Sequence, residues 1–220
     1  MNTPLEPRRF RSTVPFYARY RLAYPETLLR RVWDFVGMKA NDGVLDLGCG
    51  PGVLTVPFAK MGARVTAIDP EPDMIAATEA AVEAAGVSVE IWQASSFAMP
   101  DGIGPFRLVT MGRSFHWTDR AKTLRTLDHL VSPGGGVASL GDTVIRSSET
   151  AWRDEWLKIM DDYGGSMRER RIENGVFRAD EALLLESRFS RLTRISTLFR
   201  REIDTDEVLD RKSTRLNSSY

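Results

Sequence analysis

The stretch "VLDLGCGPG", residues 44–52, joins a short apolar run to three closely spaced glycines. The apolar run is typical of a buried strand, and the glycines indicate a loop whose backbone a ligand can approach closely. A dinucleotide, a nucleoside triphosphate and S-adenosylmethionine can each bind a glycine-rich loop after a strand, so this stretch alone leaves three kinds of function open.

Length and composition narrow the class of protein. The chain has 220 residues, which suits one α/β domain with a full hydrophobic core. Thirty basic residues balance thirty acidic ones, so a general basic surface for nucleic acid is not expected. No apolar run approaches the roughly 18 residues of a membrane span, residues 1–20 lack a signal-peptide core, and Cys49 has no cysteine partner. We expect a cytoplasmic protein without nucleic-acid or membrane partners, of open oligomeric state.

Apolar segments of strand length alternate with helical segments up to residue 142. Strands are expected at 43–48, 63–69, 87–94, 106–112 and 136–142, and helices at 25–36, 71–85 and 119–131. Pro57 should delay or kink the helix that follows the glycine loop, and "SPGGG" (132–136) is a strong turn signal. The alternation predicts an α/β fold with a doubly wound, mostly parallel sheet that is covered on both faces.

The pattern changes after residue 142. Here we expect a helix at 148–164, an arginine-rich turn at 168–171, a short helix at 179–187 and a further strand at 191–203. Residues 210–220 resemble the translation of a sequencing-library adapter, so we expect the natural sequence to continue differently beyond about Leu209.

A single domain is therefore expected over residues 1–209. Its expected parts are an N-terminal arm and helix at 1–40, a cofactor-binding core at 41–142 and a helical substrate-side region at 143–190. Residues 210–220 would be a foreign tail.

The surroundings of the glycine loop discriminate between the candidate ligands. A dinucleotide fingerprint needs G-x-G-x-x-G, but here the third glycine is Gly52 and Val53 follows it. A phosphate-binding G-x-x-x-x-G-K-[ST] motif is also missing. Asp46 would repel a pyrophosphate, whereas it suits the ammonium and sulfonium of S-adenosylmethionine. In that interpretation the loop N–H groups face the carboxylate of the ligand.

A second acid indicates a nucleoside without choosing between the candidates. Asp69 ends the second expected strand, 21 residues after Gly48, and an acid at this spacing accepts hydrogen bonds from ribose hydroxyls. The alternative is that Asp69 caps the helix that begins near Glu71. Both roles can coexist.

Five motifs in a fixed order resemble those of class I S-adenosylmethionine-dependent methyltransferases. They are "VLDLGCGPG", "AIDPEPDMI" (67–75), "QASSFAMP" (93–100), "LVTMGRSFHW" (108–117) and "VSPGG" (131–135). In addition, "YARYRLAYP" (17–25) resembles the Tyr-x-x-Tyr-Arg-x-x-Tyr-Pro arm of a small-molecule (type 11-like) group of that family. The resemblance implies a Rossmann-like sheet of seven strands with the last antiparallel, a strand that this chain would lack if it is truncated.

The same resemblance implies S-adenosylmethionine as the cofactor and assigns contacts to it. The methionine part would be held by Asp46, Gly48, Cys49 and Gly50, and the ribose by Asp69. The adenine would lie near Pro70, Met74, Ser95, Ser96 and Phe97, and the sulfonium beside Met111 and Gly112. Tyr17, Tyr20 and Arg21 of the arm would close over the cofactor, or would simply pack.

The segment after the fourth expected strand holds the candidates for chemistry on the acceptor. His116 is the candidate general base, although a His-Trp pair here can instead shape a pocket wall. Trp117 and Phe115 are candidate contacts, with core packing as the alternative for Phe115. Arg113 either recognises an acidic acceptor or forms an ion pair. Asp119 is expected to be a helix N-cap, and no metal is expected.

These expectations favour S-adenosylmethionine-dependent methyl transfer to a small-molecule acceptor by in-line displacement. Two alternatives stay open at this point. One is an NAD(P)-dependent oxidoreductase, and the other is a non-catalytic S-adenosylmethionine-binding protein of the same fold. The sequence does not identify the acceptor.

Overall fold

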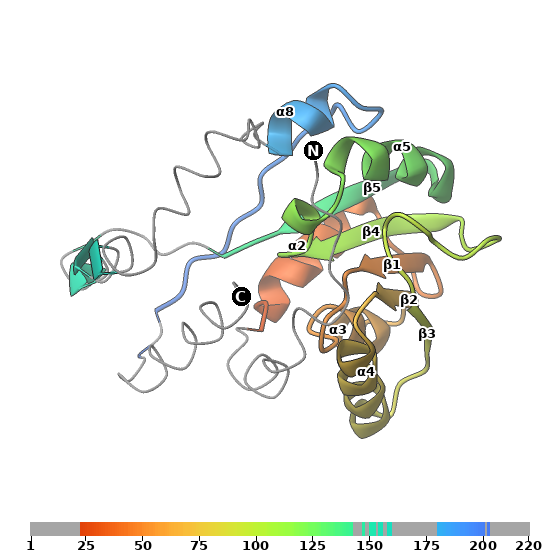
Figure 1. The fold of residues 1–220 in the computed structure, drawn as a ribbon, viewed down its shortest axis with the longest axis horizontal. Coiled ribbons are helices and arrows are strands. Elements are labelled where there is room, and N and C mark those ends of the chain that lie inside the picture. The colour runs from red at the N-terminus through yellow and green to blue at the C-terminus, as the bar shows by residue number, and fades with distance from the viewer. Residues whose placement is uncertain are drawn as a thin grey trace.

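A five-stranded parallel sheet forms the centre of the computed structural model (Figure 1). The structure describes residues 23–142, 180–200 and 202, together with the isolated positions 147, 150–152, 154, 155, 158 and 159. The strand order is β3-β2-β1-β4-β5. The strands are β1 (Gly43–Leu47), β2 (Arg64–Asp69), β3 (Val89–Gln93), β4 (Phe106–Gly112) and β5 (Val131–Leu140). The predicted Rossmann-like α/β fold is confirmed, whereas the described residues form five strands and not seven.

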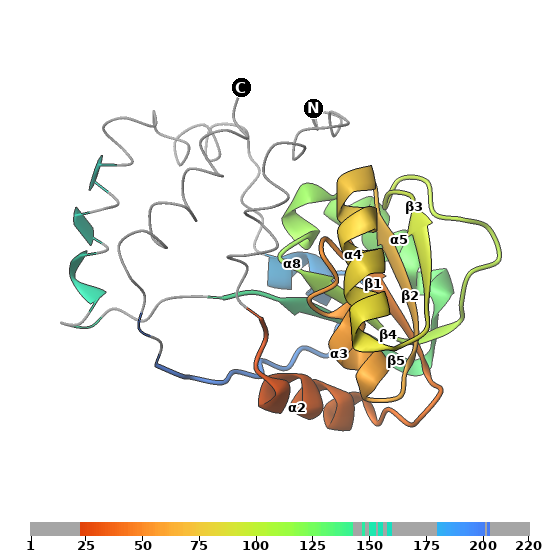
Figure 2. The same cartoon turned by 90° about the horizontal axis from the view of Figure 1, so that it is seen from below.

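Helices cover both faces of the sheet. Their bounds are α2 (Glu26–Val36), α3 (Thr55–Lys60), α4 (Pro72–Ala85), α5 (Arg120–Leu130) and α8 (Asp180–Leu185). Side chains of α2 and α3 pack on one face, and side chains of α5 and α8 pack on the other. Helix α4 lies beside α3 and contacts β2 and β3 (Figure 2). The fold is therefore doubly wound, as predicted.

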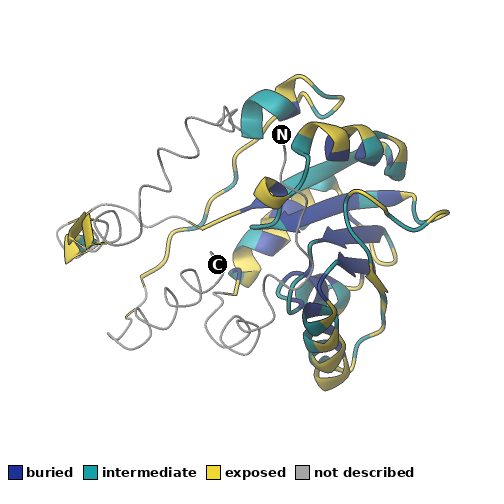
Figure 3. Ribbon diagram, in the orientation of Figure 1, coloured by how far each residue is buried: buried dark blue, intermediate teal, exposed yellow. Residues whose placement is uncertain are grey.

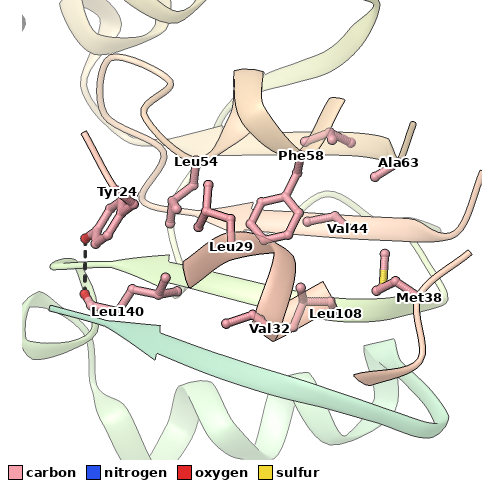
Figure 4. Close-up of a cluster of buried hydrophobic side chains, with 11 residues drawn as sticks. Tyr24, Leu29, Val32, Met38, Val44, Leu54, Phe58, Ala63, Leu108 and Leu140 are labelled. Carbon is pink, nitrogen blue, oxygen red and sulfur yellow. Dashed lines mark hydrogen bonds between the residues drawn. The ribbon is translucent and has the colours of Figure 1, made fainter. Parts of the chain in front are cut away.

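The central strand β1 separates two hydrophobic cores because successive side chains of a strand point to opposite faces. All five residues of β1 are buried, which gives the dark blue centre of the sheet in Figure 3. Val44 belongs to the cluster under α2 and α3, drawn in Figure 4, where it packs near Leu29 and Phe58. Leu45 belongs to the cluster under α5 and α8. The near-continuous apolar strand thus reflects burial on both sides.

Local signals placed several helix ends correctly. Helix α4 begins at Pro72, and proline is tolerated there because the first N–H groups of a helix have no partner within it. The helix ends before Gly86, which adopts the left-handed conformation. Pro57 lies in the first turn of α3, which begins only at Thr55. Both features agree with the sequence expectation.

The expected turn at 132–136 is wrong. Helix α5 passes directly into β5, and residues 132–135 form an irregular bulge between two paired positions, Phe106 with Val131 and Leu108 with Gly136. Glycines make this possible, since a Cβ at Gly135 would lie 2.6 Å from the carbonyl oxygen of Arg107. A glycine-rich string can therefore permit close backbone contact inside a sheet as well as a turn.

The region beyond residue 142 agrees with the sequence expectation only in part. Helix α8 confirms the short helix expected at 179–187. The strand expected at 191–203 is wrong for residues 191–200, which form no strand with the other described residues. Instead, Ile195 packs against the cluster under α2, and Arg31 of α2 donates to the carbonyl oxygen of Ser196 at 3.1 Å.

Several expectations concern residues that the structure does not describe. The arm residues Tyr17, Tyr20 and Arg21, the turn at 168–171 and the tail at 210–220 lie outside the described residues, as does most of the helix expected at 148–164. Within the described part of the chain, no helix has the length and apolar character to cross a membrane.

Helix α2 offers a test of how the core is packed. Leu29→Ala should lower the free energy of unfolding by about 2–5 kcal/mol, because Leu29 is 1% exposed and the lost side chain leaves a cavity. Phe35→Ala in the same helix should change it by less than about 0.5 kcal/mol, because Phe35 is 61% exposed. Urea unfolding of both variants checks this, and equal losses would contradict the packing of α2 described above.

Candidate functional site

Three segments meet at the carboxyl ends of neighbouring strands. The glycine loop (residues 48–53) follows β1, Asp69 ends β2, and the segment 113–118 follows β4. The strand order reverses at β1, between β2 and β4, and ligands of such sheets bind at this switch point. Hydrogen bonds join the three segments, so the sheet brings together residues that are distant in sequence.

The glycines of the loop have different structural roles. Gly48, Gly50 and Gly52 have φ angles of 74°, 55° and 78°, a region that favours glycine. A Cβ at Gly48 would lie 2.5 Å from the Cβ of Ser114, so this glycine permits close packing of two protein segments. A Cβ at Gly50 would meet no atom of the described residues within 4 Å. Among the described residues, the space beside Gly50 is therefore open.

The N–H groups of the glycine loop are engaged within the protein. Those of Gly48 and Cys49 both donate to the carbonyl oxygen of Ile68, at 2.8 and 3.0 Å. That of Gly50 donates to Oδ2 of Asp69 at 2.9 Å, and that of Gly52 donates to the carbonyl oxygen of Cys49 at 3.1 Å. The expectation that the glycine N–H groups face a ligand carboxylate is therefore wrong. They complete the contact of β1 with β2 and the turn of the loop.

Asp46 lies beneath the start of α3. It is 1% exposed, and its carboxylate accepts hydrogen bonds from the hydroxyls of Thr55 at 2.6 Å and Thr110 at 3.1 Å. Burial raises the pKa of Asp46 to about 6, and the hydrogen bonds from the two threonines oppose that rise. Asp46 thus joins β1, α3 and β4 from inside the protein.

Asp69 connects the glycine loop to the start of α4. It is 7% exposed, and it accepts from the N–H of Glu71 at 3.0 Å and from the N–H of Gly50 at 2.9 Å. Burial raises the pKa of Asp69, and both N–H bonds act against that shift. Asp69 is not the N-cap of α4, since Glu71 holds that position, but its bond to the N–H of Glu71 fixes the residue from which the helix starts. Each carboxylate oxygen has a second lone pair, so ribose hydroxyls can still donate to Asp69.

Cys49 is a buried structural residue of the loop. It is 3% exposed, and burial raises the pKa of its thiol well above the ordinary value, so a reactive thiolate is disfavoured. Its Sγ lies 3.6 Å from Oγ1 of Thr78, whose hydroxyl donates to the carbonyl oxygen of Gly50. Sequence reasoning missed Thr78, because nothing local marks a threonine on α4 as a support for a loop that is 28 residues away.

The other expected cofactor contacts differ in burial. Met74 and Met111 are fully packed, at 4% and 0% exposure, and Met111 belongs to the core cluster under α5. Phe97 is 44% exposed, and the remaining residues are half-buried: Pro70, Ser95, Ser96 and Gly112. All of them lie at the carboxyl ends of β2, β3 and β4 or on the segment that follows, as expected.

The segment after β4 divides into a buried and an exposed part. Phe115 is 1% exposed and packs in the core, which decides between the two roles considered for it. His116 and Trp117 are exposed, and their ring centroids lie 4.9 Å apart. Oδ1 of Asp119 accepts from the N–H of Lys122 at 3.1 Å, which confirms Asp119 as the N-cap of α5. The described residues contain no cluster of His, Cys, Asp or Glu that could hold a metal ion.

Arg113 forms contacts to two neighbouring segments. Its Nη1 lies 3.0 Å from Oδ1 of Asp142, and its guanidinium carbon lies 4.7 Å from the ring centroid of Tyr24. The hydroxyl of Tyr24 donates to the carbonyl oxygen of Leu140 at 3.2 Å (Figure 4). Tyr24 is the last tyrosine of the arm motif. Sequence reasoning considered Tyr17, Tyr20 and Arg21 of that motif, with packing as the alternative to a cofactor role, and it gave Tyr24 no role.

Comparisons with known proteins show what the chain is similar to. Residues 44–135 match a family model described as a methyltransferase domain, and these residues contain the glycine loop, both acids and the segment after β4. The chain therefore carries a methyltransferase domain at residues 44–135. It is 30% identical over 165 residues to an uncharacterized methyltransferase of Mycobacterium tuberculosis, with 73% of this chain and 62% of the relative covered.

Other methyltransferases match shorter parts or share only the fold. The chain is 39% identical over 125 residues to a ubiquinone biosynthesis O-methyltransferase of Methylocella silvestris. This match covers 52% of this chain and 49% of that protein. It thus spans less than two thirds of the length of these curated relatives. A solved S-adenosylmethionine-dependent methyltransferase from Clostridium acetobutylicum has the same fold, with a TM-score of 0.51, 17% identity and coverage of 59% and 56%.

The different roles of the loop glycines predict different costs of substitution. Gly50→Ala should lower the free energy of unfolding by about 1–2 kcal/mol, the cost of a left-handed backbone in open space. Gly48→Ala should lower it by about 1–3 kcal/mol more, because the new Cβ also overlaps Ser114. Urea unfolding measures both values, and equal losses would contradict the close contact at Gly48.

The buried carboxyl of Asp46 predicts a pH dependence of stability. Because folding raises the pKa of Asp46 to about 6, the folded protein holds a proton that the unfolded chain releases between about pH 4 and about pH 6. The stability contributed by Asp46 should therefore fall by about 3 kcal/mol as the pH rises through this window. Asp46→Asn should lack this fall. Urea unfolding of both proteins at pH 4.5 and 7.5 checks this, and a pH-independent difference between them would contradict it.

Proposed function

We propose that this protein transfers the methyl group of S-adenosylmethionine to a small-molecule acceptor by in-line displacement. The observation that carries the proposal is the hydrogen bond from the N–H of Gly50 to the carboxylate of Asp69 at 2.9 Å. This bond places a buried negative charge at the glycine loop and uses an N–H group that a phosphate would need. The described residues also leave open space beside Gly50.

The same bond argues against a dinucleotide. In a dinucleotide site the pyrophosphate lies against the N–H groups of the glycine-rich turn and the start of the helix that follows. Here four N–H groups of the loop donate to protein oxygens. The carboxylates of Asp46 and Asp69 are both buried close to the loop, and they would repel a pyrophosphate there. A cationic ligand without phosphates fits these charges better, which disfavours the NAD(P)-dependent alternative.

The roles that we propose for the chain follow from this arrangement. S-adenosylmethionine, when bound, supplies an electrophilic methyl group on a sulfonium. Asp69 would accept hydrogen bonds from the ribose, Gly50 would give the cofactor room, and Asp46 would hold the loop from below. Gly112, at the end of β4, would border the reacting centre. Catalysis would come mainly from holding the two reactants in line and away from water.

A small-molecule acceptor is supported by composition and by relatives. The balanced charge of the chain offers no general attraction to a nucleic-acid backbone. Relatives named ubiquinone biosynthesis O-methyltransferases match at 39% and 40% identity, although over only 52% and 42% of this chain. We propose that His116 serves as general base where the acceptor retains its proton, and that Trp117 contacts the acceptor. Both side chains are exposed beside the end of β4.

Cofactor binding by Asp69 gives the decisive test. The wild-type protein should bind S-adenosylmethionine, and Asp69→Ala should weaken binding at least about tenfold, because charge-assisted hydrogen bonds of about 1.5–3 kcal/mol to the ribose are lost. Asp73→Asn, in the first turn of α4, is the matched control and should leave the affinity unchanged. Isothermal titration calorimetry with S-adenosylmethionine and with NAD measures these affinities.

Two outcomes would contradict the proposal in different ways. Binding of NAD without binding of S-adenosylmethionine would overturn the choice of cofactor. Retained cofactor binding with no methyl transfer to any compound in a broad screen of hydroxyl, amine and thiol acceptors would favour a non-catalytic binding protein of this fold.

A further inference from the structure

Two consecutive residues after β4 make contacts in different directions. Arg113 has a φ of 60°, a left-handed conformation that is uncommon for a residue with a side chain. The side chain of Arg113 reaches Asp142 and Tyr24, whereas the hydroxyl of the next residue, Ser114, donates to the carbonyl oxygen of Leu47 at 2.7 Å. The start of the segment 113–118 is therefore fixed on two sides.

Ser114 makes the contact that faces the cofactor side. Leu47 is the last residue of β1, so its carbonyl group is where the glycine loop begins. A Cβ at Gly48 would lie 2.5 Å from Cβ and 2.9 Å from Oγ of Ser114. Gly48 and Ser114 thus form a matched pair, in which the missing side chain of one makes room for the side chain of the other. The hydrogen bond and the close packing both set the distance between the two segments.

Arg113 makes the contact on the opposite side. Its side chain is 11% exposed, between the ring of Tyr24 and the carboxylate of Asp142. Tyr24 is in turn bound to the carbonyl oxygen of Leu140, the last residue of β5. These contacts engage Nη1 and the face of the guanidinium group with protein partners, which favours a structural role for Arg113 over binding of the acceptor.

We propose that Ser114 is a positioning residue, which fixes the acceptor-side segment 113–118 relative to the cofactor-side glycine loop. Arg113 holds the same segment on its other side, through Tyr24 and Asp142 near the end of β5. The inference rests on the proposed function. Methyl transfer needs the acceptor atom about 3–3.5 Å from the methyl carbon and in line with the bond that breaks. The segment with His116 and Trp117 follows β4, and the glycine loop follows β1. Pairing of β1 with β4 aligns the two strands, and the contact of Ser114 sets the positions of the segments beyond their ends.

A matched pair of serines tests the proposal. The hydroxyl of Ser187 donates to the carbonyl oxygen of Leu184 at 2.7 Å, the same kind and length of bond as that of Ser114, but beyond the end of α8. Ser114→Ala and Ser187→Ala should each lower the melting temperature by about 2–4 °C. Only Ser114→Ala should weaken the binding of S-adenosylmethionine, by about fivefold in calorimetry, the loss expected for one hydrogen bond.

The result also separates this inference from the proposed function. If the wild-type protein binds S-adenosylmethionine and Ser114→Ala binds it equally well, the positioning role is overturned and the proposed function stands. If the wild-type protein does not bind S-adenosylmethionine, the proposed function falls and this inference falls with it. If both serine variants bind S-adenosylmethionine equally weakly, lower stability alone explains the lost affinity, and the positioning role is also overturned.

A double substitution tests the packing half of the proposal without any ligand. Ser114→Gly should relieve the overlap created by Gly48→Ala, so the loss of melting temperature in the double variant should be smaller than the sum of the single losses. The control pair, Gly50→Ala with Ser114→Gly, should be additive, because a Cβ at Gly50 would meet neither Ser114 nor any other described residue within 4 Å. Additivity in both pairs would overturn the matched contact of Gly48 and Ser114.

Discussion

The carboxylate of Asp69 is the group on which the arrangement of the site depends. One oxygen accepts from the N–H of Gly50 and the other from the N–H of Glu71, so a single side chain joins the glycine loop after β1 to the start of α4 after β2. Burial raises its pKa, and the two N–H bonds offset part of the desolvation. The N–H of Gly50 is therefore engaged by a protein carboxylate, whereas a dinucleotide-binding loop would present its N–H groups to phosphate.

A second buried carboxylate supports the same loop from below. Asp46 is surrounded by the hydroxyls of Thr55 and Thr110, and burial is the main cause of its raised pKa. Burial of a carboxyl group costs stability unless hydrogen bonds compensate, and here three elements supply or hold the partners. The two acids thus differ in position: Asp46 is enclosed by β1, α3 and β4, whereas Asp69 lies at the end of β2 beside the open space at Gly50.

The part of the chain that matches other methyltransferases is also the part that builds this site. Residues 44–135 include the glycine loop, both acids and the segment with Ser114 and His116. The contacts of Arg113 extend the site on either side of that range, to Tyr24 before it and to Asp142 after it. The matched residues are therefore joined to flanking segments of this chain that lie outside the matched range.

The sequence by itself determined the elements whose causes are local. Apolar runs placed β1 to β4 within a few residues, and Pro72 and Gly86 marked the ends of α4, because strand burial and helix termination act over short stretches. Only the tertiary structure decided which oxygen each loop N–H meets, and that Ser114 lies against Gly48. It also decided that residues 132–135 form a bulge and that residues 191–200 form no strand with the described sheet. These contacts join residues that are distant in sequence, so they depend on how strands and helices pack and not on local preference.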